Sequence, residues 1–380
     1  MALASLRTEF PVSGRYIYLD HAGVAPVSGR VRAAVERFIA ESAGSGAFTY
    51  PEWAKQISET RSLAAQLLNA ETSEIAFVRS TSHGLSLVAE GLPWNTGENV
   101  VVYEKEFPAN LFPWLHLERK GVEARIVRAR NGRVEIDDIA SAIDEKTRLI
   151  ALSSVQFTTG FRVDLEKLGG ICRSKGVLLC VDAIQSLGLI PADVQRCCID
   201  FLAADAHKWL MGPEGIGIFY CRKGLAEQLE PPLVGWKSVM NEFAFETPVF
   251  DLKTDAQRFE EGSLNLMGII GLGAAIGLLL EAGIERIERR VLDLGDLIIQ
   301  EADARNFSVL SPGDRRERGG IVTVAGTFDP VGVREGLRKK GIMVNTRAGG
   351  IRISPHFYNT EEEIRDCFRT IDQLTAERSC

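Results

Sequence analysis

Residues 176–220 read GVLLCVDAIQSLGLIPADVQRCCIDFLAADAHKWLMGPEGIGIFY. The stretch contains three apolar runs with strand character, at 177–182, 199–204 and 215–220. Continuous runs of Val, Ile and Leu of this length favour strands that are buried on both faces of a parallel sheet. Ligands of such sheets bind beyond the carboxyl ends of the strands. We therefore expect Asp182, Gln185 and Lys208 to lie together at one edge of the sheet.

The residues at these strand ends indicate a carbonyl cofactor rather than a metal ion. Enzymes that use pyridoxal phosphate (PLP) need a lysine for a Schiff base and a carboxylate that keeps the pyridine nitrogen protonated. Asp182 and Lys208 provide such a pair. The seven cysteines contain no C-x-x-C pair and form no metal-ligand pattern with the five histidines, so we expect no metal site.

Several motifs in this region resemble one protein family. D-A-I-Q at 182–185 is followed by A-H-K-W-L-x-G-P-x-G-I-G, which begins at Ala206. This order is similar to the class V aminotransferase family of fold-type I PLP enzymes, which includes cysteine desulfurases, selenocysteine lyase and isopenicillin N epimerase-like proteins. The resemblance extends over residues 16–370. It implies an α/β fold with a large, mostly parallel seven-stranded sheet domain and a smaller α+β C-terminal domain.

The resemblance also divides the chain into three segments. They are an N-terminal segment across the active-site mouth, a large PLP-binding domain and a small C-terminal domain, at 1–27, 28–265 and 266–380. By resemblance, backbone NH groups of Ala22 and Gly23 approach the substrate carboxylate. The residues themselves equally fit a plain strand–turn–helix entry. The role of His21 stays open.

The resemblance assigns cofactor contacts to the central stretch. Lys208 would form the Schiff base, and burial would lower the pKa of its amine from roughly 10.4. Asp182 would pair with the pyridine nitrogen and Gln185 would bind the phenolate oxygen, although both residues also fit helix-capping roles. His207 would bind the phosphate. Asp205 stands where relatives often carry serine, and its role stays open because a carboxylate beside a phosphate is unfavourable.

Residues 74–92 predict a phosphate site at the start of a helix. A strand that ends at Arg79 is followed by hydroxyl side chains and then by an apolar helix. Hydroxyls and free NH groups at a helix N-terminus bind anions, because the helix dipole and the unpaired donors point there. The family uses this turn for the PLP phosphate, so we expect contacts from Thr81 and Ser82. A helix cap without a ligand is the alternative, and the role of His83 is open.

We expect two further residues, Phe107 and Gln156, to lie at the cofactor ring, because each follows a predicted strand. Phe107 follows the strand at 99–103 and matches the branch of the family in which a phenylalanine stacks on the pyridine ring. The alternative is a core phenylalanine beside a proline turn. Cysteine desulfurase-like relatives carry an asparagine near the cofactor and the substrate carboxylate, where this sequence has Phe157. Gln156 is the tentative replacement.

Two motifs in the second half of the chain resemble substrate and subunit contacts of the family. R-F-E-E-G-S-L-N at 258–265 matches a motif whose hydroxyl reaches the phosphate of the neighbouring subunit. Ser263 therefore implies a homodimer with a shared active site, with a helix N-cap as the alternative. Arg352 matches the arginine that binds the substrate α-carboxylate, a task suited to a bidentate guanidinium; a structural arginine on a strand is the alternative. Arg347 could read a second anionic group or lie in solvent.

Composition limits the partners and the setting. The net charge of −7 argues against nucleic acid and anionic membranes as main partners. No basic and apolar leader pattern follows Met1, so we do not expect secretion. The longest uncharged apolar stretch, Met267–Leu280, is shorter than the ~18 residues that indicate a membrane span, which predicts a buried helix. Cysteines without a disulfide framework fit a reduced, cytoplasmic setting.

Together these features predict a PLP-dependent enzyme that acts on the α-amino group of an amino acid. We expect an aminotransferase first, with a β-lyase or an epimerase as the alternative. Cysteine desulfurases need a cysteine nucleophile on a loop shortly before the carboxylate-binding arginine, and residues 344–351 contain none. This argues against sulfur transfer through a persulfide, but not against a lyase that releases its leaving group directly. A PLP-fold protein without catalysis is a further alternative, against which Lys208, Asp182 and Arg352 together argue.

Overall fold

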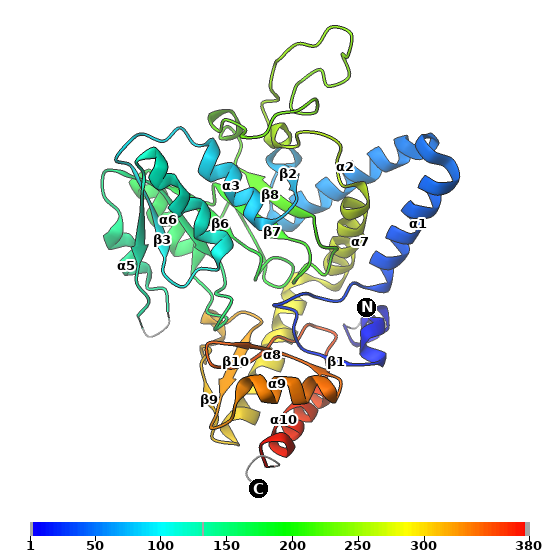
Figure 1. The fold of residues 1–380 in the computed structure, drawn as a ribbon, viewed down its shortest axis with the longest axis vertical. Helices are drawn as coiled ribbons and strands as arrows, with labels where there is room; N and C mark the ends of the chain where they lie inside the picture. The colour runs from blue at the N-terminus through cyan, green and yellow to red at the C-terminus, as the bar shows by residue number, and fades with distance from the viewer. Residues whose placement is uncertain (1–2, 131–132, 377–380) are drawn as a thin grey trace.

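The structure is a computed structural model that describes residues 3–130 and 133–376 (Figure 1). Its centre is a seven-stranded sheet in the order β2-β8-β7-β6-β5-β3-β4. These strands are β2 (Ile75–Val78), β3 (Asn99–Tyr103), β4 (Glu123–Val127), β5 (Thr147–Ser153), β6 (Leu178–Asp182), β7 (Phe201–Asp205) and β8 (Gly217–Cys221). All neighbours pair in parallel except β8, which is antiparallel to β2 and β7. The predicted large, mostly parallel sheet is confirmed.

The third apolar run of residues 176–220 differs from its prediction. The first two runs form the parallel neighbours β6 and β7, but the run at 215–220 forms β8, which is antiparallel to β7. Parallel neighbours need a crossover of about a dozen or more residues, usually a helix. The connection at 206–216 is a turn without a helix, so the chain doubles back. This turn carries Lys208.

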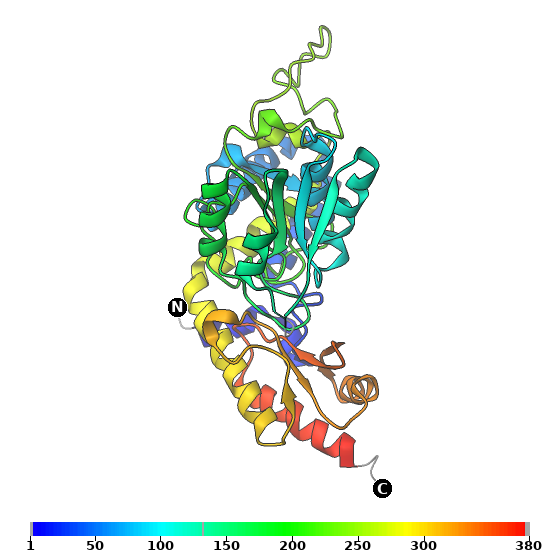
Figure 2. The ribbon, with the colours of Figure 1, turned by 90° about the vertical axis from the view of Figure 1, so that its left-hand side faces the viewer.

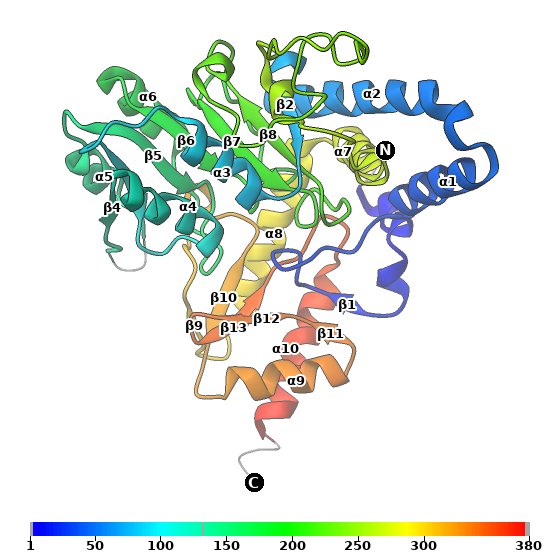
Figure 3. The same ribbon diagram turned by 45° about the horizontal axis from the view of Figure 1, so that its top comes forward.

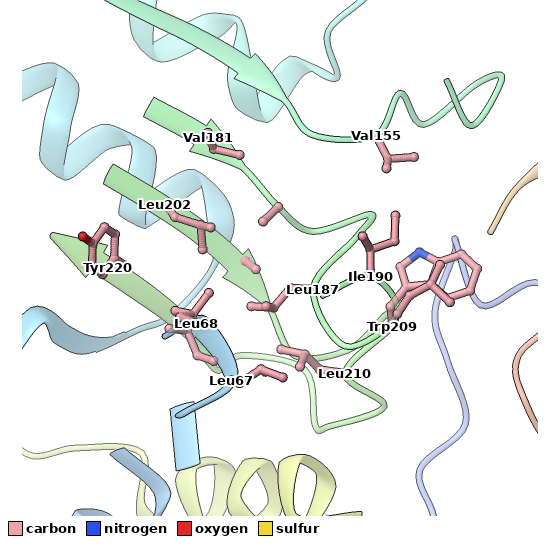
Figure 4. Close-up of a cluster of buried hydrophobic side chains, with 14 of the residues drawn as sticks. Leu67, Leu68, Val155, Val181, Leu187, Ile190, Leu202, Trp209, Leu210 and Tyr220 are labelled. Atoms are coloured by element: carbon pink, nitrogen blue, oxygen red, sulfur yellow. The ribbon is translucent and has the colours of Figure 1, made fainter. Parts of the chain in front are cut away.

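Helices cover both faces of the large sheet (Figure 2). In chain order the α-helices are α1 (Gly29–Ser45), α2 (Tyr50–Leu68), α3 (Thr81–Gly91), α4 (Phe112–Leu115), α5 (Ile136–Ala142), α6 (Leu165–Lys175), α7 (Leu266–Ala282), α8 (Ile284–Asp303), α9 (Pro330–Lys339) and α10 (Glu361–Ala376). Helix α3 shares one hydrophobic cluster with Ala151 and Cys180. Helices α2, α6 and α7 share another with Val181 and Leu202, part of which is shown in Figure 4. Because successive side chains of a strand point to opposite faces, Asp182 lies on the α3 side.

A smaller antiparallel sheet forms the C-terminal part of the molecule. Its strands, in spatial order, are β12 (Asn345–Arg347), β13 (Gly350–Ile353), β10 (Val322–Ala325) and β9 (Ser308–Val309). Buried side chains of α8, α9 and α10 form one hydrophobic cluster with this sheet. The N-terminal strand β1 (Ile17–Tyr18) pairs in parallel with β11 (Ile342–Met343). The start of the chain is therefore attached to the C-terminal part, as Figure 3 shows.

Helix α7 is the buried apolar helix that the sequence predicted. It packs against α1 and α2, and a Cβ at Gly273 would lie 2.3 Å from the Thr60 hydroxyl, so this crossing requires glycine. Its apolar side chains join the cluster of the large sheet, although α7 falls in the segment predicted at 266–380; that division stays a prediction. Within the described ranges no single helix meets the length and hydropathy of a membrane span, and only the bent pair of α7 and α8 does so together.

Candidate active site

Lys208 lies in the turn after β7, at the carboxyl edge of the large sheet. The turn is closed by hydrogen bonds from the Met211 NH to the Lys208 carbonyl and from the Gly212 NH to the Ala206 carbonyl. The Lys208 Nζ lies 5.6 Å from the centroid of the Phe107 ring. Burial lowers the pKa of Lys208 from 10.5 to about 8, against the opposing influence of the Asp182 charge. A neutral, nucleophilic amine is therefore accessible near neutral pH.

Asp182 ends β6, between Ser153 of β5 and Ala203 of β7. Its side chain is 1% exposed, and one carboxylate oxygen accepts a hydrogen bond from the Ile184 NH at 3.0 Å. Burial raises the pKa of Asp182 to about 7, and the charge of Glu106 raises it further whereas Lys208 opposes the rise. A protonated ring nitrogen would supply the positive partner that this buried carboxylate needs.

The phosphate residues predicted from sequence meet where α3 begins. The Thr81 hydroxyl accepts a hydrogen bond from the Asp205 NH at 3.0 Å, which joins the start of α3 to the end of β7. Ser80 caps the helix by accepting the His83 NH. Ser82 is exposed at the same turn, and His207 is half-buried, with its Nδ1 3.9 Å from an Asp205 oxygen. The helix N-terminus and these side chains suit an anion.

Phe107 and Gln156 lie on the β3 and β5 side of the site. The Phe107 ring is 42% exposed, so it is not the core residue of the alternative interpretation. It makes an edge contact with Phe157, with ring centroids 5.2 Å apart, and leaves an open apolar platform near Lys208. Gln156 is buried, and its Nε2 donates to a Glu106 oxygen at 3.0 Å.

Gln185 has partners within the chain. Its Nε2 donates to the Ala22 carbonyl at 3.1 Å, and its Oε1 accepts from the Trp209 indole at 2.8 Å. The side chain thus connects the N-terminal segment to the turn that carries Lys208. Its contact with the cofactor stays a prediction.

The NH groups of the N-terminal segment have hydrogen-bond partners within the protein. The Ala22 NH donates to the Ser354 hydroxyl at 3.1 Å, and the Gly23 NH donates to the Asp20 carbonyl at 3.0 Å. The turn thus closes on itself and on Ser354, the residue after β13, so in this structure both NH groups have partners within the protein. Their contact with the substrate carboxylate stays a prediction. His21 is buried, with its ring nitrogens at the Ser354 carbonyl and the Tyr358 hydroxyl, and burial lowers its pKa to about 4. It is a neutral structural residue.

Arg352 is paired with Asp20, a residue that sequence reasoning did not assign. The Arg352 Nη2 lies 3.0 Å from an Asp20 oxygen, and Nη1 donates to the Phe157 carbonyl. Both side chains are buried, at 1% and 5% exposure. Arg347 lies on the same face of the β12–β13 hairpin, because Asn345 pairs with Arg352 and strand side chains alternate. The charge of Arg347 opposes protonation of Lys208 and so favours a lower pKa.

Ser263 lies before α7 and is exposed. The cap of α7 is Asn265, whose side chain accepts the Gly268 NH, so the alternative role of Ser263 as a helix cap is wrong. Its contact with a neighbouring subunit stays a prediction.

Several polar atoms of the site are buried and lack a hydrogen-bond partner within the described residues. They are Gln156 Oε1, Asp205 Oδ1 and Arg352 Nε. Buried polar atoms are normally paired in folded proteins. Together with the lysine of lowered pKa, the buried acid, the aromatic platform and the helix N-terminus, they fit a polar ligand such as PLP. A cavity of about 640 Å³, lined by Ser154, Ala183 and Ser186 among others, contains none of the predicted cofactor residues.

This site geometry defines a PLP enzyme of fold type I. The family described as aminotransferase class-V matches residues 17–366, and the protein belongs to it. The chain is 31% identical to a probable cysteine desulfurase of Methanothermobacter thermautotrophicus, covering 98% of each protein. It is 30% identical to the uncharacterized aminotransferase YcbU of Bacillus subtilis, covering 90% of each.

A solved structure supports the same class. The apo cysteine desulfurase of Thermococcus onnurineus superimposes with a TM-score of 0.89 at 27% identity, over 98% of both chains. Because the protein belongs to the class V aminotransferase family, its cofactor is PLP, as the sequence predicted.

Asp20 and Glu106 are the polar residues of the site that the sequence prediction missed. Asp20 directly precedes His21 in the N-terminal segment, but its partner Arg352 is 332 positions away and cannot be inferred from the sequence. Glu106 stands in the charged run 104–106, which resembles an exposed turn. An acid directly before a predicted stacking phenylalanine was the available signal.

Proposed function

We propose that the protein is a PLP-dependent lyase that removes a substituent from the β-carbon of an amino acid and releases it directly. The β12–β13 hairpin supports this proposal. Its connection is the two-residue turn Ala348-Gly349, both residues with positive φ, and residues 344–353 contain no cysteine. The hairpin therefore offers neither a cysteine to accept sulfur nor a longer loop that could carry one. Relatives named cysteine desulfurase favour lyase chemistry over the aminotransferase that we expected first.

The residues of the site suit removal of the proton at the substrate Cα. When bound, PLP supplies an electron sink for the charge that develops at this carbon. Lys208, with its lowered pKa, accepts the proton and can return it to the leaving group. Asp182 holds a proton at the ring nitrogen. Arg352 would hold the α-carboxylate of the substrate, and Phe107 would provide an apolar contact for the cofactor ring.

Transamination is the second candidate, because two relatives are named uncharacterized aminotransferases. The same Lys208, Asp182 and Arg352 would serve it. The two reactions differ in where the proton goes after it leaves Cα, and in whether a β-substituent departs.

The amino-acid response of the PLP-loaded protein distinguishes these functions. We expect L-cysteine or L-cystine, without a keto acid, to give repeated turnover. For cysteine the balance is one water consumed and one pyruvate, one ammonia and one sulfide released. Pyruvate, ammonia and sulfide are measured together with the cofactor spectrum, which should return to its starting form. A single stoichiometric conversion of PLP to its pyridoxamine form, with release of the matching keto acid, would instead establish an aminotransferase.

We further propose a homodimer with a shared active site. The segment 231–257 projects from the body at the top of Figure 1. It exposes Phe243, Phe245 and Phe250 by 66%, 69% and 74%. Glu242 forms ion pairs with Lys237 and Lys253, which connect the two ends of the segment while its phenylalanine side chains remain exposed. Exposed apolar groups of this kind mark interaction surfaces.

Replacing Phe243 and Phe245 together with serine is expected to shift the protein from dimer to monomer. The physical reason is the loss of apolar area that a second copy would bury. Light scattering after size-exclusion chromatography measures the mass, and absorbance measures PLP occupancy. Val331→Ser, on the exposed face of α9, is the matched control. A monomeric native protein with full PLP occupancy would contradict both the dimer and the role of Ser263.

A further inference from the structure

The Glu106 carboxylate is buried next to the cofactor site and has no role in the chemistry described above. It directly precedes Phe107 and is 6% exposed. Its Oε1 accepts the Ser153 NH at 2.8 Å and the Gln156 Nε2 at 3.0 Å. Its Oε2 accepts the Asn110 Nδ2 at 3.1 Å and a short hydrogen bond from the Ser153 hydroxyl. Each oxygen thus accepts two hydrogen bonds.

These four bonds suit an ionised carboxylate. The backbone NH and the two side-chain amides can only donate, and an ionised carboxylate can only accept. Within residues 3–130 and 133–376, no lysine, arginine or histidine forms an ion pair with Glu106. Burial raises the pKa of Glu106, whereas its hydrogen bonds lower it. The charge is solvated by neutral dipoles and not cancelled by a cation.

The position of Glu106 connects three parts of the site. It fixes the end of β5 through Ser153, which pairs with Asp182 in the sheet. It holds Gln156 through its side-chain amide, and it fixes Asn110 in the turn after Phe107. The Asp182 carboxylate therefore has a second buried carboxylate one strand away, whose charge raises the pKa of Asp182.

We propose that Glu106 is a positioning residue of the PLP site, which holds the Phe107 platform in place and acts through Asp182 to keep the ring nitrogen of the cofactor protonated. A negative charge behind Asp182 makes that carboxylate a stronger partner for a proton on the ring. Both carboxylates are buried, and electrostatic interactions are stronger in such a water-poor environment than in water. This role depends on bound PLP and not on the lyase proposal.

The test separates the charge of Glu106 from its shape. Glu106→Gln keeps the size of the side chain and removes the charge, whereas Glu106→Asp keeps the charge on a shorter chain. Glu104→Gln is the matched control, because Glu104 is exposed two residues earlier at the same strand end. Each holoenzyme is loaded with PLP labelled with ¹⁵N in the ring. The ring-nitrogen NMR signal, PLP stoichiometry, and kcat and KM are measured.

We expect Glu106→Gln to retain PLP and to move the ring-nitrogen signal towards the unprotonated form. Its kcat should fall by about tenfold to a hundredfold, the range typical of partners that support a site through one intermediate residue, with KM little changed. Glu106→Asp should restore most of the protonated signal, and Glu104→Gln should match the native protein. A native signal and native kcat in Glu106→Gln would overturn the proposal. If Glu106→Gln does not fold, loss of the protonated signal in a folded Glu106→Asp would overturn the proposal, because that variant keeps the charge.

Discussion

Replacing Lys208 with alanine is expected to abolish covalent attachment of PLP to the protein. Lys208 follows β7, its pKa is lowered by burial to about 8, and its Nζ faces the Phe107 ring. Turnover should fall by at least about 10²- to 10⁴-fold, the range for losing a general base alone. Borohydride reduction followed by peptide mass spectrometry measures the attachment.

The exposed Lys105, close to the same platform, provides the matched control as Lys105→Ala, which should retain attachment and turnover. In the native apoprotein, the rate of PLP capture should rise with pH through about 8, because the neutral amine is the reactive form and the pKa of Lys208 is lowered from 10.5. Cofactor fixed to a peptide that lacks residue 208 would show that the lysine is misassigned.

Replacing Arg352 with alanine is expected to raise KM for amino acids by about 30- to 1,000-fold, the effect of removing one partner of a buried, hydrogen-bonded charge pair, with a smaller change in kcat. It should also lower the free energy of unfolding by about 3 kcal/mol or more, because Asp20 is left as an unpaired buried charge. Steady-state kinetics and denaturant unfolding measure the two effects. Arg316→Ala, on an exposed turn, is the control.

A double variant separates the two roles of Arg352. Combining Asp20→Asn with Arg352→Ala removes both buried charges, so the free energy of unfolding should recover in part. KM should stay raised, because the α-carboxylate still lacks its partner. Recovery of KM together with stability would show that Arg352 only supports the fold.

The sequence predicted those parts of the structure that depend on local pattern. Runs of Val, Ile and Leu located β6 and β7. Asp182 ends β6 and Lys208 follows β7, both at the sheet edge as expected. The direction of β8 could not be predicted from its sequence, because a strand that is buried on both faces has the same apolar pattern whether it runs parallel or antiparallel to its neighbours. The family resemblance supplied the cofactor, which no periodicity could name.

Other parts of the site depend on contacts between distant residues. Asp20 and Arg352 are 332 positions apart, and Ser153 and Glu106 are 47 apart. Neither contact produces a local sequence motif from which it could be predicted. The reaction itself was the weakest prediction, because one set of residues serves both transamination and elimination. The absence of a cysteine in the hairpin was the only evidence on the reaction that the sequence offered. It argued against sulfur transfer through a persulfide, but it did not distinguish elimination from transamination.

The pairing of β1 with β11 has a consequence for how the protein is made. The residues of β1 leave the ribosome well before those of β11. Asp20 can form its hydrogen bond with Asn345 only after 325 further residues have been made. During synthesis the large sheet can form while this segment still has no strand to join. Arg352 and its acidic partner Asp20 can meet only after the strand that carries Arg352 has been made. A nascent chain stalled before β11 should therefore hold a nearly finished sheet with an unfinished substrate pocket.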